Sequence, residues 1–438
     1  MNILACMFQG GGNVPLIVPI LQELAARGHR VRVMAGPGVR HSRLPISASL
    51  LQRISDIGAE LVRFDEPEVH PFDEGRYSER PLIASWTPAS FRSPQREART
   101  AVWAPAWSRN VADELRREKA DVVVADFVLL GALVAAEAAR IPSVALMHTI
   151  YPWPVAGGPP YGPGYAPKAG LSGFCRDVIG RAIVDRLWIR NALSPLNSAR
   201  LLSGLQAVRS PLQQYGTAAR VLVLVSPAFD WPAPRFPANV RHVGTPEDRS
   251  GPIKPSEDWL TEGTGPLVVV SLSTLDQGQS GTLRKILAAL ADLPVRALVT
   301  LGPALEAGQF EPPANVRLVD FVPHDLVLPN AHALVTQCGI GTVTKSLRHG
   351  VPMVCLPLVG DQHDNAARVA ARHAGIRLPA NAGCGDIRSA IMRVLQDESF
   401  QQGALALRSA MLSDGAPAHQ AADQIEQAAR SLDGDRSG

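Results

Sequence analysis

Short apolar runs and amphipathic segments alternate from the first residues of the chain. Residues 3–8 form an apolar run, and residues 15–27 then place leucines and isoleucines at helical spacing. Gly28 predicts the end of that helix, and the apolar residues 31–34 predict the next strand. The beginning of the sequence therefore predicts a strand-helix-strand unit.

The same alternation recurs farther along the chain. Residues 121–127 predict a strand, a helix follows through Ala139, and residues 143–147 predict another strand. Further strands are predicted at residues 221–225, 267–272, 295–301, 316–321, 333–336 and 352–356, with a helix at 282–293. Strands that alternate with helices indicate parallel sheets covered on both faces, so the predicted fold class is α/β.

Length and composition narrow this picture. A chain of 438 residues is too long for one ordinary core, so two domains are expected. The formal net charge of +3 is too small to indicate a nucleic-acid or acidic-membrane partner. The most apolar window, residues 121–147, is interrupted by charged residues, so no membrane span is predicted.

Cysteine usage and the first residues bear on the compartment. The five cysteines are an odd number at unrelated spacings, which predicts neither a disulfide framework nor a zinc site. The N-terminal residues have no basic flank and no small-residue cleavage site, so a signal peptide is not expected. The prediction is a protein of the reducing cytoplasm.

Three segments interrupt the regular pattern. Residues 67–110 and 150–173 are irregular, and the second is rich in Pro, Gly and Tyr. Such a loop is usually functional or mobile, although a plain surface excursion is equally compatible with it. The Pro-rich residues 232–255 are typical of an interdomain linker. The predicted division is an N-terminal domain at 1–235, a linker at 236–263, a C-terminal domain at 264–415 and a final helix within 416–438.

A glycine run follows the first predicted strand. Residues 10–12 are all glycine, but the GxGxxG spacing is missing and no carboxylate ends the second strand at 34–36. The run therefore predicts a tight strand-to-helix turn near a ligand, and not a dinucleotide site.

A second glycine turn lies at residues 337–341, after the predicted strand 333–336. A helix from Thr342 to His349 would follow it. Backbone N–H groups at a helix start suit a diphosphate, although a tight turn without a ligand would give the same pattern.

Residues 357–366 open another helix where the strands end. Asp361 and Gln362 together offer hydrogen-bond acceptors and donors, the combination that binds adjacent sugar hydroxyls. The alternative is that Asp361 only caps the helix.

These motifs together resemble the family 1 glycosyltransferases, which include plant-type UDP-glycosyltransferases and bacterial natural-product enzymes. The family signature runs from a His-Gly-Gly-x-Gly-Thr turn, through a Gly-Val-Pro strand, to an Asp-Gln-x-x-Asn-Ala helix start. Residues 339–342, 350–353 and 361–366 match it in order and spacing. Residues 315–324 resemble the segment that holds the nucleotide base, and residues 239–244 resemble the entry to the linker.

The resemblance implies a GT-B fold, in which two Rossmann-like domains face each other across a cleft. The C-terminal domain would hold a nucleotide sugar, the N-terminal domain would hold the acceptor, and the last helix would cross back to the N-terminal domain. The donor-binding residues expected are Ser273, Thr274, Val322, His324, Gln337, Gly339, Gly341, Thr342, Asp361 and Gln362. The acceptor-binding residues expected are Gly12, Asn13, Tyr151 and Trp153.

The catalytic centre departs from the family pattern. The family's base is a His after the N-terminal glycine turn, where this chain has Asn13. An amide has no useful proton affinity, so Asn13 could only orient an acceptor. The family's partner carboxylate corresponds to Asp126, which could act directly or through a water on an acidic acceptor such as a phenol. The alternative is that His148, after the strand 143–147, supplies the missing base.

The diphosphate turn departs as well. Gln337 and Cys338 replace a His and a Gly of the family signature. Gln337 can donate a hydrogen bond but carries no charge, so it would stabilise the leaving diphosphate less than the family's histidine does. Cys338 is predicted to be structural, because no base adjoins it in sequence.

The predicted function is inverting sugar transfer from a UDP or dTDP donor to a small, aromatic or natural-product acceptor, without a metal or a further cofactor. Two other functions stay open. The loss of both family histidines would suit a non-catalytic auxiliary protein that binds a nucleotide sugar, and the fold would also suit a nucleotide-sugar epimerase. The sequence predicts no oligomeric state.

Overall fold

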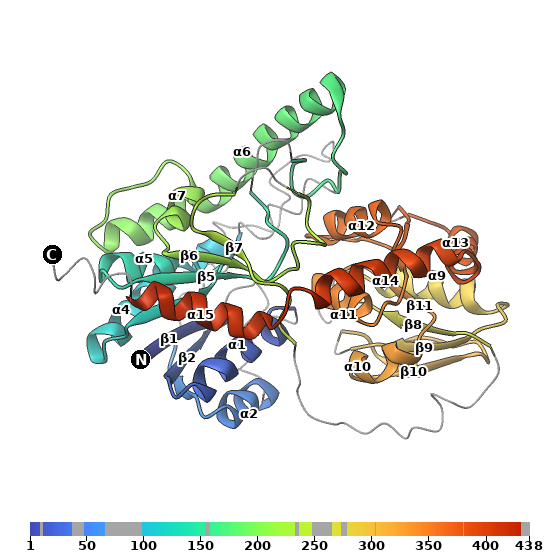
Figure 1. Cartoon of the computed structure of the whole chain (residues 1–438), viewed down its shortest axis with the longest axis horizontal. Helices are drawn as coiled ribbons and strands as arrows, with labels where there is room; N and C mark the ends of the chain where they lie inside the picture. The colour runs from blue at the N-terminus through green and yellow to red at the C-terminus, as the bar shows by residue number, and fades with distance from the viewer. Residues whose placement is uncertain are drawn as a thin grey trace.

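The computed structural model describes residues 1–8, 12–36, 48–65, 99–153, 158–232, 236–247, 265–272, 278–302, 304–379 and 381–430. These residues form two parallel sheets that lie side by side, each with its own helices (Figure 1). Every strand pair described is parallel. The α/β class predicted from the alternating pattern is therefore confirmed.

The N-terminal sheet has seven strands in the order β3-β2-β1-β4-β5-β6-β7. Its strands are β1 (Asn2–Phe8), β2 (Arg30–Gly36), β3 (Glu60–Val62), β4 (Val122–Asp126), β5 (Ser143–Met147), β6 (Arg220–Val223) and β7 (Val240–His242). The strand order reverses direction between β1 and β4. Ligands of open α/β sheets bind at the carboxyl ends of the strands beside such a switch point.

The C-terminal sheet has six strands in the order β10-β9-β8-β11-β12-β13. Its strands are β8 (Leu267–Ser271), β9 (Arg296–Thr300), β10 (Val316–Val319), β11 (Ala333–Thr336), β12 (Met353–Cys355) and β13 (Gly375–Arg377). Its switch point lies between β8 and β11. The predicted diphosphate turn directly follows β11, so the topology places that turn at the switch point.

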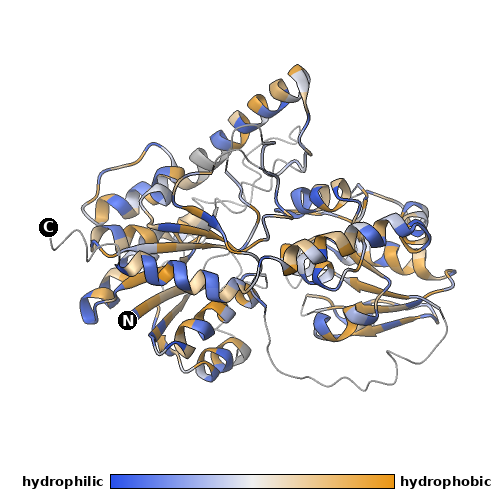
Figure 2. Ribbon diagram, viewed as in Figure 1, coloured by the Kyte–Doolittle hydropathy of each residue, from blue (hydrophilic) through white to orange (hydrophobic). Residues whose placement is uncertain are grey.

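Helices cover both faces of each sheet, which explains why the strands are apolar on both sides. In β1, the side chains of Ile3, Ala5 and Met7 pack on one face and those of Leu4, Cys6 and Phe8 on the other, all of them buried. Figure 2 shows the same pattern, with strands mainly hydrophobic and the outer sides of helices hydrophilic.

The helices of the N-terminal part are α1 (Val14–Ala26), α2 (Ala48–Asp56), η2 (Arg99–Trp103), α4 (Ala104–Arg117), α5 (Leu130–Ala138), α6 (Gly170–Leu202) and α7 (Pro211–Gly216). Those of the C-terminal part are α9 (Ser280–Leu290), η3 (Ala307–Gln309), α10 (His324–Val327), η4 (Leu328–Asn330), α11 (Ile340–Arg348), α12 (Gln362–Ala371), α13 (Cys384–Gln396), α14 (Glu398–Leu412) and α15 (Pro417–Arg430). No helix among the described residues is long and apolar enough to cross a membrane.

The last helix, α15, lies against the N-terminal sheet. Its alanines and Ile425 join the buried cluster formed by α1 and β1. In Figure 1 the chain leaves α14 on the C-terminal sheet and runs as α15 beside α1. Charged side chains reinforce this contact: Arg27 Nη1 lies 2.6 Å from Asp423, and His29 Nε2 lies 2.9 Å from Glu426, among other pairs.

Most predicted elements agree with the structure to within a few residues, and the differences have physical reasons. Helix α11 begins at Ile340, two residues before the predicted start, because Gly339 forms its N-cap. Strand β7 lies inside the predicted linker and pairs with β6, since a short edge strand tolerates prolines around it. The expected irregular segment 67–110 is helical from Arg99 onward, and its residues 67–98 lie outside the described residues.

Close packing of α4 on α5 depends on a glycine. A Cβ placed on Gly131 would lie 2.0 Å from the carbonyl oxygen of Ala104, which is far inside van der Waals contact. We expect Gly131→Ala to lower the free energy of unfolding by about 3 kcal/mol, since backbone atoms must move apart. Urea unfolding measures this, with Gly385→Ala in α13 as control, because a Cβ there meets no atom within 4 Å. Equal stability of both variants would contradict the proposed packing.

Candidate active site

Three predicted catalytic residues meet at the carboxyl ends of neighbouring strands. Asp126 is the last residue of β4, His148 directly follows β5, and Asn13 precedes α1 at the end of the turn after β1. The Nδ2 atom of Asn13 donates to Oδ2 of Asp126 at 2.9 Å, and Nδ1 of His148 lies 3.2 Å from the same oxygen. The structure thus brings all three into one cluster around a carboxylate.

The carboxylate of Asp126 is completely buried. Its Oδ1 accepts a hydrogen bond from the backbone N–H of Val128 at 3.2 Å. Its Oδ2 accepts the hydrogen bond from Asn13, the residue that precedes α1. Asn13 also donates to the carbonyl oxygen of Phe8 at 2.9 Å, so its amide is used inside the protein. Asp126 therefore cannot meet an acceptor hydroxyl directly.

His148 is the exposed member of the cluster, with 17% of its side chain accessible. Its ring lies 5.1 Å from that of Phe127 in a T-shaped arrangement and 6.1 Å from that of Phe8. Because Nδ1 is turned to the carboxylate, proton exchange with an acceptor would involve the other ring nitrogen, Nε2. A buried carboxylate behind an accessible imidazole is an arrangement that supports general base catalysis.

The C-terminal domain presents the predicted diphosphate turn to this cluster. A Cβ placed on Gly341 of α11 would lie 4.0 Å from the carbonyl oxygen of Gly12, so the two glycine turns face each other. The first turn of α11 begins on Gly339, whose carbonyl accepts from the N–H groups of Thr342 and Val343 at 3.0 Å each. The start of this helix therefore lies opposite the turn that carries Asn13, and its N–H groups suit a diphosphate.

Gln337 and Cys338 fill the turn before α11. Cys338 has a φ of +68°, in the left-handed region that favours glycine, which fits the glycine of the family signature at this place. Burial, together with the neighbouring Cys355, raises the pKa of the Cys338 thiol, so it stays protonated at neutral pH. Gln337 is also buried, and within the described residues its Oε1 has no hydrogen-bond partner.

Asp361 and Gln362 begin α12, and their side chains differ in what they contact. The carboxylate of Asp361 does not cap the helix; its Oδ2 accepts from Thr149 Oγ1 and from Asn365 Nδ2, both at 2.9 Å. Burial raises the pKa of Asp361, while these two donors and the nearby His148 oppose the rise. The Oε1 of Gln362 accepts from the backbone N–H groups of Leu358 and Val359, so this oxygen shapes the loop.

Four donor-site predictions remain: Val322, His324, Ser273 and Thr274. Val322 is buried after β10, and His324 opens α10, where burial lowers its pKa to about 4. His324 is therefore neutral at pH 7. Ser273 and Thr274 lie outside the described residues.

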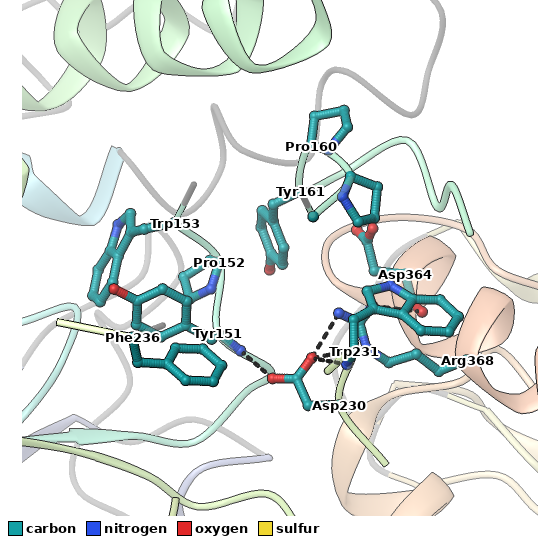
Figure 3. A pocket seen from close by; sticks show the side chains of 12 residues that line it. Tyr151, Pro152, Trp153, Pro160, Tyr161, Asp230, Trp231, Phe236, Asp364 and Arg368 are labelled. Carbon is teal, nitrogen blue, oxygen red and sulfur yellow. Dashed lines mark hydrogen bonds and ion pairs between the residues drawn. The ribbon is translucent and has the colours of Figure 1, made fainter. Parts of the chain in front are cut away.

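An aromatic pocket opens between the segment after β5, the segment after β6 and helix α12 (Figure 3). Its space amounts to ≈ 390 Å³, including the part that is open to solvent. Tyr151 and Trp153 line it, with ring centroids 5.3 Å apart, and Tyr161 and Trp231 lie on other sides. Gly12 and Asn13 do not line it, so the predicted acceptor residues fall into two groups.

A buried ion pair joins the two domains at the floor of this pocket. Asp230 Oδ1 accepts from Arg368 Nη2 at 2.7 Å, while its Oδ2 accepts from Tyr151 N at 3.1 Å and lies 3.3 Å from His242 Nε2. Burial alone would raise the pKa of Asp230, but Arg368 and His242 hold it below its usual range. Through Asp230, the segment after β5 is thereby fixed to helix α12 of the C-terminal domain.

A second buried carboxylate in the pocket, Asp364, is expected to make stability depend on pH. Its Oδ2 accepts from Gly162 N at 2.6 Å, and burial raises its pKa to about 7. The folded protein thus holds a proton that the unfolded chain releases above about pH 4, so stability should fall between about pH 4 and pH 7, by at most about 4 kcal/mol. Unfolding in urea at pH 5 and pH 8 measures this fall, which Asp364→Asn should largely remove. The same pH dependence in both proteins would contradict it.

The structure adds contacts for Thr149, which the sequence analysis did not single out, and for Asn365, which matched the family motif without an assigned role. Thr149 and Asn365 bind the carboxylate of Asp361, and Asn365 also donates to the carbonyl of Cys338 at 2.9 Å. The position of Thr149 after a predicted strand was the available signal. Among the described residues, no group of three or more His, Cys, Asp or Glu side chains could hold a metal ion.

Comparison with known proteins assigns the chain to a family. The model of the family described as UDP-glucoronosyl and UDP-glucosyl transferase matches residues 16–417. The 4'-demethylrebeccamycin synthase of Lentzea aerocolonigenes is 29% identical over 415 residues, which cover 93% of this chain and 94% of the relative. The demethyllactenocin mycarosyltransferase of Streptomyces fradiae is 33% identical over 227 residues, 49% of each chain.

Solved structures share the fold over almost the whole chain. The glycosyltransferase of kitacinnamycin superimposes with a TM-score of 0.72 at 21% identity, covering 98% of both chains. The glycosyltransferase VinC, in complex with dTDP, superimposes with a TM-score of 0.69 at 20% identity, covering 98% of this chain and 100% of that one. The predicted GT-B fold is thereby confirmed. The chain belongs to the UDP-glucoronosyl and UDP-glucosyl transferase family, as a GT-B glycosyltransferase that takes its sugar from a nucleotide-sugar donor.

Proposed function

We propose that His148, oriented by Asp126, is the general base of this glycosyltransferase and replaces the histidine that is absent at Asn13. The observation that carries the proposal is the 3.2 Å contact between Nδ1 of His148 and the buried carboxylate. It restores a His–Asp pair with a histidine from the end of β5. Asn13 keeps a supporting role, since it holds the same carboxylate oxygen.

The reaction then follows from the arrangement of the two domains. Nε2 of His148 takes the proton of the acceptor hydroxyl, and the oxygen attacks the anomeric carbon of the donor sugar. The bond from that carbon to the diphosphate breaks on the opposite side, and the electron pair leaves with the diphosphate. A single in-line displacement inverts the anomeric configuration. Asp126 stabilises the imidazolium that forms.

The donor site is proposed at the carboxyl edge of the second sheet. Asp361 and the amide nitrogen of Gln362 would hold the sugar hydroxyls, and α11 would stabilise the departing diphosphate through its N-terminal amides. The diphosphate and base contacts are proposed for Ser273, Thr274, Val322, His324, Gln337, Gly339, Gly341 and Thr342. The donor is proposed to be a UDP- or dTDP-sugar.

The acceptor is proposed to be a small aromatic natural product. The relatives described above are named for the compounds demethylrebeccamycin and demethyllactenocin. Tyr151 and Trp153 present aromatic surface in a pocket beside Phe127. The rings of Phe127 and Trp153 are 6.4 Å apart, and Phe127 also touches His148. Aromatic contacts therefore run from the pocket to the proposed base.

A product assay tests the function. The purified protein is incubated with a panel of UDP- and dTDP-sugars and with phenolic, alcoholic and polycyclic acceptors, and products are read by mass spectrometry. The expected result is a sugar-mass adduct that depends on His148. Binding of a nucleotide sugar by calorimetry, without an adduct from any acceptor class, would support the auxiliary-protein function instead.

A further inference from the structure

One hydrogen bond joins the acceptor domain directly to the proposed sugar-binding carboxylate. Oγ1 of Thr149 donates to Oδ2 of Asp361 at 2.9 Å, although the two residues are 212 positions apart in the sequence. Thr149 is buried, with 3% of its surface exposed. The contact is therefore a specific, partly buried link across the cleft.

Thr149, which donates this hydrogen bond, directly follows the proposed base His148 in the sequence. His148 and Thr149 both follow β5, whose residues are buried and pair with β4 and β6. Because the two side chains leave one short stretch of backbone, a shift of Thr149 moves His148 as well. The strand end thus holds the base and the contact to Asp361 at a fixed separation.

Asp361, which accepts this hydrogen bond, is also connected to the predicted diphosphate turn through Asn365. Asn365 donates from the same Nδ2 to Oδ2 of Asp361 and to the carbonyl oxygen of Cys338, both at 2.9 Å. Asp361 therefore lies between Thr149 on the acceptor side and Asn365 on the donor side. With Oδ2 held by both, the other carboxylate oxygen would remain for the sugar hydroxyls.

We propose that Thr149 is a positioning residue that sets the place of the donor sugar relative to His148. This inference rests on the proposed function, in which Asp361 binds the sugar and His148 is the base. In-line attack requires the acceptor oxygen and the anomeric carbon to lie about 3–3.5 Å apart. A hydrogen bond that joins the sugar-binding carboxylate to the neighbour of the base holds that separation when the cleft is closed.

The expected signature is a loss of rate without an equal loss of donor binding. Thr149→Val keeps the shape of the side chain and removes the hydroxyl. We expect it to lower kcat by about 10- to 100-fold, the range for a lost hydrogen bond to a charged group and for a misplaced reactant. Its donor dissociation constant, measured by calorimetry with the nucleotide sugar that the product assay selects, should change by less than about 3-fold.

Two variants separate positioning from general packing. Thr149→Ser restores the hydroxyl and should recover most of the rate. Thr245→Val is the matched control, since Thr245 is also buried and its Oγ1 has no hydrogen-bond partner within the described residues. It should leave kcat and the donor dissociation constant unchanged.

Two results would overturn the inference. The first is an unchanged kcat for Thr149→Val; if donor binding is also tighter, the hydroxyl only occupies the place of the sugar. The second is a Thr149→Ser variant as slow as Thr149→Val. His148→Ala, measured alongside, tests the proposed function separately: an unchanged rate there would contradict the base assignment and not the Thr149 contact.

Discussion

Replacing His148 by alanine is expected to slow sugar transfer to an alcohol by about 10²- to 10⁴-fold, the usual contribution of a general base. The loss should appear in kcat, because the imidazole takes the proton only as the new bond forms. Asp126 cannot take over, since it is completely buried and already accepts hydrogen bonds from Asn13 and Val128. Steady-state rates of the variant and the wild type measure the effect.

Two companion variants make this result specific. His419→Ala removes an exposed histidine of α15 and should leave the rate unchanged. Asp126→Asn should lower the rate as well, because an amide cannot stabilise the imidazolium that forms on His148. If His148→Ala kept its rate while Asp126→Asn lost it, the carboxylate itself would be the base.

Replacing Arg32 by methionine is expected to cost about 3–5 kcal/mol of unfolding free energy, the usual effect of removing one partner from a buried ion pair. Arg32 is completely buried in β2 and pairs through Nη1 with Glu114 of α4. It also donates from Nε to Asn2 at 3.0 Å and from Nη2 to the carbonyl of Glu118 at 2.9 Å. Without Arg32, the buried carboxylate of Glu114 keeps only one of its two arginine partners, the half-exposed Arg117.

The neighbouring strand position supplies the control for this measurement. Arg30 lies in the same strand and pairs with Glu60, but 56% of its side chain is exposed, so Arg30→Met should change stability far less. The double variant Arg32→Met with Glu114→Leu should recover much of the loss, because no buried charge is left unpaired. Equal losses for Arg30→Met and Arg32→Met in urea unfolding would contradict this account of the pair.

The sequence predicted the sheets well because the parallel strands are buried on both faces. Apolar runs at 122–125 and 144–147 mark β4 and β5, and Gly28, with a φ of +79°, follows the end of α1. The sequence placed Asp126 and His148 each at the end of a predicted strand and offered them as alternative bases, without predicting a contact between them. The distance between them and the burial of Asp126 depend on packing, which no local pattern contains.

Long helix α6 was not predicted because its apolar residues do not stay on one buried face. Leu171 and Phe174 in its first turns are 77% and 63% exposed, whereas Leu196 near its end is buried. In Figure 1 the first half of this helix extends away from both sheets. A periodicity argument needs one environment along the whole helix, and α6 crosses two.

Contacts between the domains were beyond the sequence. The link from Thr149 to Asp361 and the ion pair from Asp230 to Arg368 join residues more than a hundred positions apart. Gln362 Oε1 accepts hydrogen bonds from the backbone of residues 358 and 359, and a motif match does not specify this contact. The family motif predicted which residues hold the donor, and the structure supplied the contacts of those that it describes.

The most direct test of the proposed base is the dependence of the His148→Ala defect on the acidity of the acceptor. A series of acceptors from an alkyl alcohol through a simple phenol to a nitrophenol needs progressively less help from a base. If His148 removes the proton, the defect should fall from about 10²- to 10⁴-fold with the alcohol to less than about 10-fold with the nitrophenol. A defect of the same size with every acceptor would show that His148 serves binding or structure, and would contradict the account.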